Sequence, residues 1–298
     1  MRALRIHAYG GPEVLRVEEA PKPVPKPGQV LVRVRAASVN PIDWKMRRGL
    51  MAKVFPIDFP RILGRDCAGE FEGGLVAGVT DPRTDGTHAE YALLPADQVA
   101  PVPEGLSAEE AASLCVTGLS AYIALVENAR VSGGHRVLIH AGAGGVGSVA
   151  IQIARQLGCE VFATASPANH EYVRSLGAAG AIDYRSQDFS TAMPPCDVIL
   201  DTIGGETHRR SLKMLKSGGT VVALAAEPIA KAQQQRSDVR DTMVNVRPTR
   251  ERLQQLFQWA TSGIIKPQVS QRFKPEDAGK AYAISESGHA RGKMVIVF

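Results

Sequence analysis

The spacing of apolar and polar residues changes along the chain near residue 107. Before that point, runs in which β-branched and polar residues alternate, as in 30–40 and 89–103, are separated by turns rich in proline and glycine, as in 20–29. Alternation with a period of two predicts half-buried strands, and the turns mark where each strand stops. The pattern therefore predicts an irregular β-rich domain over residues 1–107.

Beyond residue 107 the pattern is that of alternating helices and strands. Ser107 and Glu110 have the spacing of a capping box, and a helical pattern follows them. Short apolar strands then recur at regular intervals, at 136–140, 160–164, 181–184, 197–201, 219–224 and 243–246. This alternation predicts a doubly wound parallel sheet in a domain over residues 108–247.

The last part of the chain, residues 248–298, combines a helical stretch with a short β-like end, GKMVIVF. That end is too short to form a domain of its own. We expect it to return to the sheet of the first domain, so that the β-rich domain is completed by both ends of the chain.

A glycine-rich turn lies between the first two strands of the parallel domain. Its residues fit the pattern G-x-G-x-x-G in a strand-turn-helix context, which predicts a dinucleotide site. We expect Gly142 to permit the sharp turn, Gly144 to let the backbone approach a pyrophosphate, and Gly147 to let the helix pack on the strand. The helix starting at Gly145 and Val146 offers its free N–H groups and positive dipole end to the phosphates.

The second strand of this unit ends without an acidic residue. Sites that prefer NADH commonly carry Asp or Glu about 20 residues beyond the glycines, to bind the ribose 2′-OH. Here the place is taken by Ala165 and Ser166, and the donors Asn169, His170 and Arg174 follow. No carboxylate there repels a 2′-phosphate, so the sequence predicts NADPH as the cofactor. Ser166 and Asn169 also have the alternative role of capping the next helix, and the two roles are compatible.

Composition narrows the class of protein. A chain of 298 residues with 44% hydrophobic and 22% charged residues predicts two ordered domains with sizeable cores. The formal net charge of +5 is modest and does not require a nucleic-acid partner. No apolar run approaches the roughly 20 residues of a membrane span, and we expect a cytoplasmic protein without a membrane partner. The four cysteines lie far apart and predict no disulfide framework.

Motifs along the whole chain resemble the zinc-free quinone oxidoreductase (zeta-crystallin-like) branch of the medium-chain dehydrogenase/reductase superfamily. They include GGPEVLRVEE, GQVLVRVRAASVNPID, ILGRDCAGEFE, GTHAEYALLPADQ, LSAEEAA, AGAGGVGSVAIQIARQLG, DVILDTIGGET and GHARGKMVIV. The resemblance implies an α/β protein, with a GroES-like catalytic domain and a Rossmann cofactor domain. It also implies a homodimer.

The positions that hold catalytic zinc in related alcohol dehydrogenases are altered in this chain. By resemblance, the first ligand position is Asn40, a Gly-His-Glu segment is replaced by Gly64-Arg65-Asp66, and Cys115 alone remains. One thiolate cannot make a site that needs three protein ligands and an open position. We therefore expect no metal, and acceptors that delocalise incoming electrons without a Lewis acid.

The resemblance also implies which residues form the site. Asn40, Asp43 and Lys45 are expected to flank the substrate beside the nicotinamide, with Lys45 as proton donor or as a point charge on the carbonyl. The alternative is that Asp43 caps a short helix and Lys45 is solvated. Cofactor contacts are expected from residues at strand ends and from three further positions. These are Tyr184, Arg185, Asp201, Thr202, Gly204, Thr117, Leu224 and Lys293.

The predicted function is that of a zinc-independent, NADPH-dependent oxidoreductase that transfers hydride to a quinone or to an alkene conjugated to a carbonyl. An enoyl-thioester reductase is an alternative within the enzymes. Another is an NADPH-binding, crystallin-like or RNA-associated protein with little turnover, although no aromatic-basic motif for reading RNA is found.

Overall fold

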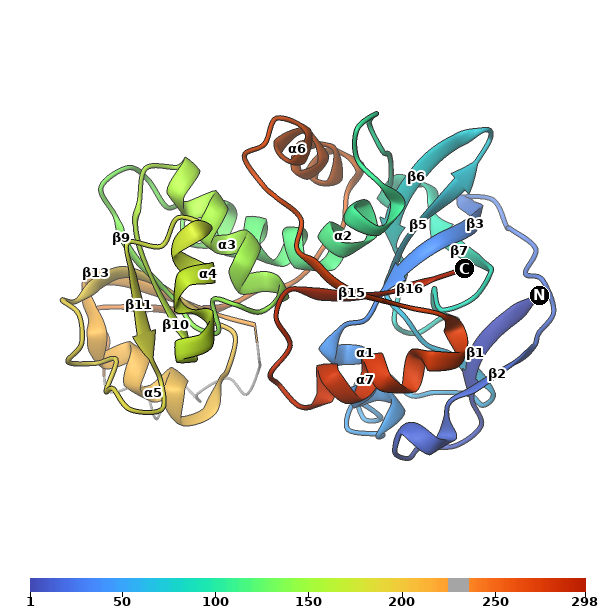
Figure 1. Ribbon diagram of the computed structural model, residues 1–298, viewed down its shortest axis with the longest axis horizontal. Helices are drawn as coiled ribbons and strands as arrows, with labels where there is room; N and C mark the ends of the chain where they lie inside the picture. Colours follow the sequence, from blue (N-terminus) through green and yellow to red (C-terminus); the bar gives the residue numbers. More distant parts are fainter. Residues whose placement is uncertain (225–235) are drawn as a thin grey trace. The chain divides into compact units, whose positions relative to one another are not determined.

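The computed structural model describes residues 1–224 and 236–298, which divide into two compact units. Unit 1 comprises Met1–Leu119 and Arg247–Phe298, and unit 2 comprises Ser120–Val246 (Figure 1). The division falls inside helix α2, Ala108–Tyr122, whereas the sequence analysis assigned that whole helix to the cofactor domain. Most of α2 belongs with unit 1 because Leu256 packs on Gly118 and the Val116 N–H donates to Asp66.

Unit 1 is built on two sheets. The three-stranded sheet has the order β2-β1-β4, and the seven-stranded sheet has the order β15-β16-β3-β5-β6-β8, with β7 also paired to β3. All pairs are antiparallel except β15 with β16. The strands are β1 Arg2–Ile6, β2 Arg16–Glu19, β3 Gln29–Ser38, β4 Arg61–Ile62, β5 Asp66–Phe71, β6 Gly74–Val79, β7 Tyr91–Pro95, β8 Val99–Pro101, β15 Val269–Phe273 and β16 Lys293–Val297.

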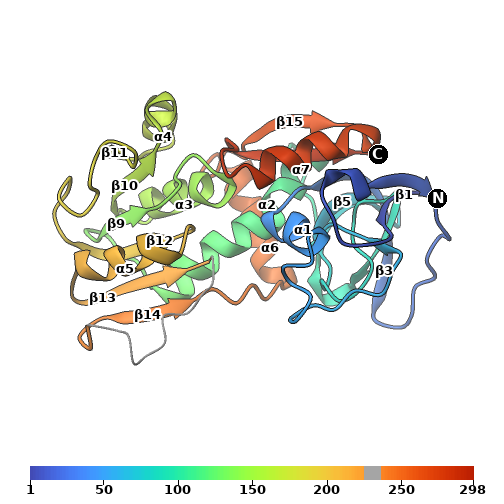
Figure 2. The same cartoon turned by 90° about the horizontal axis from the view of Figure 1, so that it is seen from below.

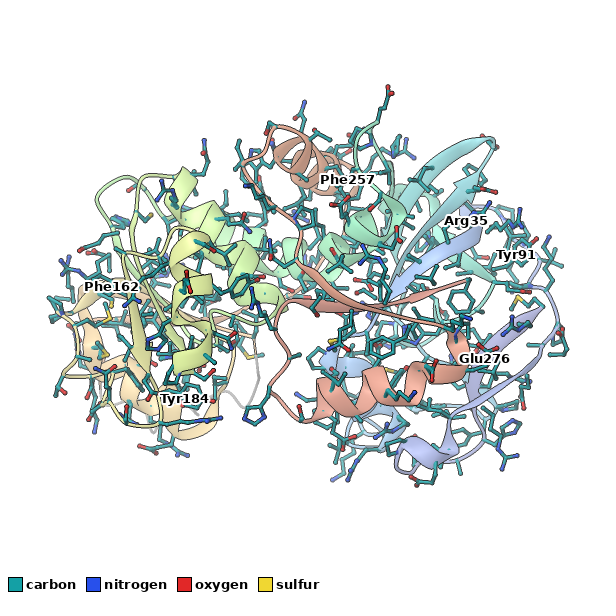
Figure 3. All side chains as sticks on the ribbon, in the orientation of Figure 1. Arg35, Tyr91, Phe162, Tyr184, Phe257 and Glu276 are labelled. Carbon is teal, nitrogen blue, oxygen red and sulfur yellow. The ribbon has the colours of Figure 1, made fainter. Side chains whose placement is uncertain are left out.

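Strand β3 shows how the sequence pattern produces this sheet. Val32 and Val34 are buried, whereas Arg33 and Arg35 are exposed and form ion pairs with Glu70 on β5. Arg35 is labelled in Figure 3. The alternation therefore separates a core face from a solvent face, as a period of two requires. The predicted β-rich N-terminal domain is confirmed.

The chain's C-terminal strand completes this sheet. β16 pairs antiparallel with β3, with Val295 opposite Ser38, so the predicted return to the first domain is confirmed. Helix α7, Ala278–Glu286, lies beside helix α1, Pro41–Arg47 (Figure 1). Helix α6, Arg250–Thr261, begins at Thr249, whose side chain accepts a hydrogen bond from the Arg252 N–H. Short 3-10 helices occupy Pro12–Val14, Ala96–Gln98 and Pro275–Asp277.

Unit 2 is a parallel sheet of six strands in the order β11-β10-β9-β12-β13-β14. Chain order runs outward from β9 in one direction and then from β12 in the other, so the sheet is doubly wound and changes direction between these two strands. Figure 2 shows β12, β13 and β14 side by side. The strands are β9 Arg136–Ile139, β10 Glu160–Ala165, β11 Gly180–Asp183, β12 Cys196–Asp201, β13 Leu215–Ala223 and β14 Arg240–Met243.

The predicted α/β fold class is thus confirmed, with one strand displaced. The last strand was expected at 243–246, but β14 ends at Met243 because its ladder with β13 pairs Thr220 with Arg240 and Ala223 with Met243. The described part of unit 2 includes helices α3 Gly145–Gln156, α4 His170–Ser175 and α5 Gly205–Met214, with a 3-10 turn at Pro167–Asn169.

Helix α2 begins at the predicted capping box. The Ser107 N–H donates to Glu110 Oε2 over 3.0 Å, and the Glu110 N–H donates to Ser107 Oγ over 3.3 Å. With the π-helical segment Ile123–Asn128 it forms 21 residues that are long and apolar enough to cross a membrane. This corrects the expectation that no segment approaches that length. Since 72% of its apolar window is buried inside the protein, packing in the core accounts for the composition.

Candidate functional site

The glycine-rich turn of unit 2 connects β9 to α3, and two of its glycines are required by close packing. A Cβ on Gly147 would lie 2.3 Å from the Ala141 carbonyl oxygen, and a Cβ on Gly142 would lie 2.6 Å from the Ala163 Cβ on β10. Both distances are far below van der Waals contact. Gly147 therefore gives room for the start of α3 to pack against the turn at Ala141 and Gly142, and the predicted packing of the helix on the strand stays a prediction.

The sharp turn itself is made by a different residue from the one expected. Ala141 adopts the left-handed conformation, with φ of 49°, and Gly142 is absent from the positive-φ glycines of the described residues. The prediction that Gly142 is needed to permit the sharp turn therefore gave the wrong physical reason for this glycine. Gly142 is needed for space against the neighbouring strand, whereas the turn strains Ala141.

Gly144 differs from these two glycines because it is partly exposed, whereas Gly142 and Gly147 are buried. A Cβ there would meet only the Ala141 oxygen within 4 Å, at 3.3 Å. Gly144 is the extended N-cap residue of α3, whose first-turn N–H groups have no partners within the helix. An accessible backbone at the positive end of a helix fits a pyrophosphate. The turn thus fits a dinucleotide, and contact between the cofactor and Gly144, Gly145 and Val146 stays a prediction.

The ends of β10 and β11 lie side by side and carry the residues expected at a 2′-phosphate. Ala165 pairs with Asp183 in register, so Ser166 and Tyr184 leave adjacent strand ends. The Asn169 Nδ2 donates to Ser166 Oγ over 3.1 Å, and His170 Nε2 donates to the Ala165 carbonyl over 3.2 Å, since a carbonyl can only accept. Ser166 precedes the 3-10 turn but makes no capping hydrogen bond through its side chain.

Two exposed residues follow β11. Tyr184 is 48% exposed at the surface of unit 2, and the Arg185 guanidinium lies 5.5 Å from its ring centroid (Figure 3). Asp183 just before them is an acidic group that the sequence analysis did not weigh. It accepts hydrogen bonds from Ser186 Oγ and the Arg185 N–H, which lower the pKa of its carboxyl group. The turn after β11 therefore holds this carboxylate in its own hydrogen bonds.

The residues after β12 form a tightly bonded loop. The buried Asp201 carboxylate accepts from the Ile203 N–H over 2.8 Å, the Gly204 N–H over 3.0 Å and His208 Nδ1 over 2.8 Å. Thr202 Oγ1 donates to the His140 carbonyl over 2.9 Å. Asp201 thus supports the loop from inside; contact between this loop and the cofactor stays a prediction.

The sequence analysis missed the histidine that completes this loop. His208 on α5 bridges two carboxylates, with Nδ1 2.8 Å from Asp201 and Nε2 3.1 Å from Asp241 on β14. The hydrogen bond to Asp201 is the main cause that raises the pKa of His208. The backbone N–H of Leu224, just after β13, donates to the Asp201 carbonyl over 2.8 Å and fixes the neighbouring strand end. No sequence motif joins these residues, because they come from different elements.

Unit 1 contains a buried group of polar side chains that we call the Asp66 cluster, consisting of Ser38, Asn40, Asp43, Asp66 and Lys293. All five are at most 5% exposed. The Asp66 carboxylate accepts from Ser38 Oγ over 2.7 Å, from Asn40 Nδ2 over 3.0 Å and from the Val116 N–H over 3.0 Å. Burial raises the pKa of Asp66, and the charge of Lys293 is the main opposing influence.

Lys293 closes the cluster from the other end of the chain. Its Nζ donates to the Val39 carbonyl over 2.5 Å and to Asn40 Oδ1 over 2.8 Å. Burial lowers the pKa of Lys293, while Asp66 and Asp43 oppose that change. The structure therefore places Lys293, which was expected at the cofactor, in hydrogen-bond contact with Asn40, which was expected at the substrate.

Asp43 lies at the start of α1, where it caps the helix. Its Oδ2 accepts from the Asn40 N–H over 2.7 Å, which is the carboxylate half of a capping box. Its Oδ1 is buried without a hydrogen-bond partner among the described residues. Burial is the main cause that raises the pKa of Asp43 to about 7. The alternative role of Asp43 as a helix cap is therefore confirmed, and it leaves one oxygen unused.

Lys45 and Thr117 have different surroundings. Lys45 is partly exposed on α1, with Nζ 5.7 Å from the centroid of the Trp44 ring, so it is the more accessible of the residues predicted around the substrate. Thr117 is buried in α2, and its Oγ1 donates to the Ser113 carbonyl one turn earlier, over 2.5 Å. Whether either contacts a ligand stays a prediction.

The positions related to a zinc site do come together in unit 1, but their chemistry does not fit the metal. Asn40 bonds to Asp66, and Asp66 bonds to the residue that follows Cys115. The Cys115 thiol donates to the Ala111 carbonyl, and burial raises its pKa well above the ordinary value. Across the described residues, no group of three or more His, Cys, Asp and Glu side chains is arranged to hold a metal. A buried ammonium, from Lys293, also faces the Asn40 oxygen.

Comparison with known families supports this description of both units. Residues 26–75 match the alcohol dehydrogenase GroES-like domain, and residues 176–296 match the zinc-binding dehydrogenase family. A 2-methylene-furan-3-one reductase from Solanum lycopersicum is 33% identical, over 99% of this chain and 79% of its own length.

Two solved structures have the same fold over the whole chain. The quinone oxidoreductase from Coxiella burnetii is 34% identical, with a TM-score of 0.94 over 100% of this chain and 99% of its own. The Escherichia coli quinone oxidoreductase complexed with NADPH is 27% identical, with a TM-score of 0.90 over 100% of both chains.

Proposed function

The chain belongs to the medium-chain dehydrogenase/reductase family, in its quinone oxidoreductase branch, and on this premise we propose that it is a zinc-independent, NADPH-dependent reductase of quinones or enones. Its general class is that of an oxidoreductase. The choice of cofactor, the independence from zinc and the class of acceptor are the parts of the proposal that need testing.

The observation that carries the choice of NADPH is the set of donors at the ends of β10 and β11. Ser166 and Asn169 present neutral polar groups, and Arg185 presents a cation, at adjacent strand ends. Asp183, which pairs with Ala165 in register, is acidic, but its carboxylate already accepts hydrogen bonds from the turn that follows β11. An additional phosphate is favoured by cationic and N–H donors, whereas a free 2′-OH needs an acceptor.

The cofactor supplies hydride when it is bound, and the protein supplies binding and orientation. The glycine-rich turn and the N-terminus of α3 hold the pyrophosphate. Lys45, which is partly exposed on α1, is the donor proposed for the oxygen that gains charge as the acceptor is reduced. Asn40 does not serve as that donor, because its amide is engaged by Asp66 and Lys293. Asn40 is therefore proposed to order the substrate slot beside the nicotinamide.

Zinc independence rests on the donor set in unit 1. The Asn40 amide, at the position expected for the first ligand, is engaged by Asp66 and Lys293, and the buried Lys293 ammonium would repel a cation beside it. We expect metal analysis of the purified protein to find no stoichiometric zinc, and chelators to leave turnover unchanged. Zinc at one equivalent, removed together with activity, would overturn this part.

The decisive experiment measures turnover and binding separately. Purified protein is assayed with NADPH or NADH against simple quinones, enones and an enoyl thioester, while dissociation constants for the two cofactors are measured by calorimetry. Oxidation of NADPH with a quinone or an enone supports the proposal. Preference for the enoyl thioester would establish the alternative reductase, and cofactor binding without turnover would support the non-enzymatic alternative.

A further inference from the structure

Lys293 and Asp66 act on Asn40 from opposite sides, and their chemistry determines how its amide is oriented. A carboxylate can only accept a hydrogen bond, so the amide nitrogen of Asn40 must face Asp66, at 3.0 Å. An ammonium can only donate, so the amide oxygen must face Lys293, at 2.8 Å. Each neighbour therefore excludes the flipped amide.

The same lysine also binds the backbone where β3 passes into α1. Its Nζ donates to the Val39 carbonyl, and the neighbouring Asn40 N–H is held by Asp43. Lys293 lies on β16, 253 residues from Asn40, and the two strands β16 and β3 pair directly. The side chain thus fixes the starting point of the helix that carries Lys45.

We propose that Lys293 is a positioning residue, whose ammonium holds the Asn40 amide and the start of α1 in place. The lysine compensates the buried charge of Asp66 and sets the position of α1, without contacting the substrate. This inference deepens the proposed function and rests on it for its kinetic consequence, but its structural part can be tested without any substrate.

The titratable and charged groups around the ammonium belong to several elements. Asp66 lies on β5, Asp43 on α1, and Arg65 immediately precedes β5. His88 lies before β7, and burial lowers its pKa to about 4, so it stays neutral at neutral and alkaline pH. Because burial lowers the pKa of Lys293 below its ordinary value, the lysine is the group of this set expected to lose its charge first as the pH rises.

The structural part is tested by NMR on the complete protein with ¹⁵N-labelled asparagine side chains. The Asn40 amide signal, assigned by its loss in Asn40→Ala, should titrate at alkaline pH in the wild type, below the ordinary lysine range. This titration should disappear in Lys293→Met. An amide signal that is unaffected by both the pH and the Lys293→Met substitution, in protein that circular dichroism shows to be folded, would overturn the inference.

The kinetic part compares Lys293→Met with the double variant Lys293→Met/Asp66→Asn. We expect the single variant to lower kcat/KM about 10- to 100-fold with little change in the dissociation constant of NADPH. Removing the second charge should recover most of the lost melting temperature but not kcat/KM, because Asn40 still lacks the donor that orients it. If kcat/KM recovers together with stability, the lysine is only half of a structural ion pair, and the positioning role is wrong.

A matched control distinguishes the loss of any lysine charge from the loss of the charge at position 293. Lys280→Met removes another lysine of unit 1, which pairs with Asp277 over 2.8 Å and is 74% exposed, and should leave both readouts unchanged. If the wild type shows no turnover with any acceptor, the proposed function fails, whereas the NMR titration still decides the position of Lys293. The two failures are therefore distinguishable.

Discussion

The Asp66 cluster of unit 1 and the glycine-rich turn of unit 2 differ in whether their polar groups are buried and hydrogen-bonded to one another. In the cluster, Asp66, Asn40 and Lys293 satisfy one another and are sealed from solvent. At the turn, Gly144 is partly exposed and is the N-cap residue of α3. Polar groups that are satisfied internally fix a position, whereas polar groups left accessible can be completed by a ligand. The comparison separates residues that arrange a site from residues that bind.

The largest expected effect comes from a substitution within the buried Asp66 cluster. Asp66→Asn should lower the free energy of unfolding by about 3 to 5 kcal/mol, because it leaves the buried Lys293 ammonium with Asp43 as the remaining nearby carboxylate. Chemical denaturation of both proteins checks this value. Glu70→Gln is the matched control, since Glu70 is an acidic residue of the same strand whose ion pairs are exposed, and a similar loss in both variants would contradict the prediction.

A second pair of variants distinguishes a glycine needed for packing from a glycine needed for cofactor binding within the glycine-rich turn. Gly147→Ala should destabilise the protein by about 1 to 3 kcal/mol or more, because its Cβ would lie 2.3 Å from a backbone oxygen. Gly144→Ala should cost less stability, yet weaken NADPH binding about tenfold by intruding where the pyrophosphate approaches. Denaturation and calorimetry measure the two effects. Equal loss of stability in both variants would remove the distinction.

The preference of unit 2 for NADPH or NADH can also be changed by a substitution just after β10. Ser166→Asp should weaken NADPH binding by about 1.4 to 2.7 kcal/mol, corresponding to roughly 10- to 100-fold, by placing a carboxylate beside the 2′-phosphate. NADH binding should improve or stay constant, because the new carboxylate can accept from the 2′-OH. Ser166→Asn, which adds size without charge, is the control. Equal dissociation constants for both cofactors in the wild type would already sink this prediction.

The last prediction concerns the pH dependence of stability and Asp43, the one carboxylate of the Asp66 cluster with an unpartnered oxygen among the described residues. Its pKa is raised to about 7, so its contribution to stability is fully present below the unfolded pKa near 3.8 and is lost as pH rises through 7. Asp43→Asn should therefore gain stability relative to the wild type as pH increases from 4 to 8. Denaturation across this range checks it, and a constant difference would count against the raised pKa.

The sequence predicted much of unit 2 because its signals are local. The glycine pattern, the helical spacing after it and the apolar strands all lie within short windows, and each reports a contact made nearby. The assignment of Gly142 shows the limit of that reasoning. A motif indicates that a side chain is not tolerated, but it does not say whether the cause is the backbone angle or a neighbour such as Ala163 on another strand.

By itself, the sequence determined the two kinds of domain, the return of the C-terminal strand and the dinucleotide turn, since periodicity and chain order suffice for these. Only the tertiary structure decided the role of Lys293, which lies 253 residues from Asn40 and meets it through the pairing of β16 with β3. The physical reason is that burial and hydrogen-bond partners determine whether a charged group binds a ligand or holds its neighbours. These are properties of packing, which residues distant in the chain create together.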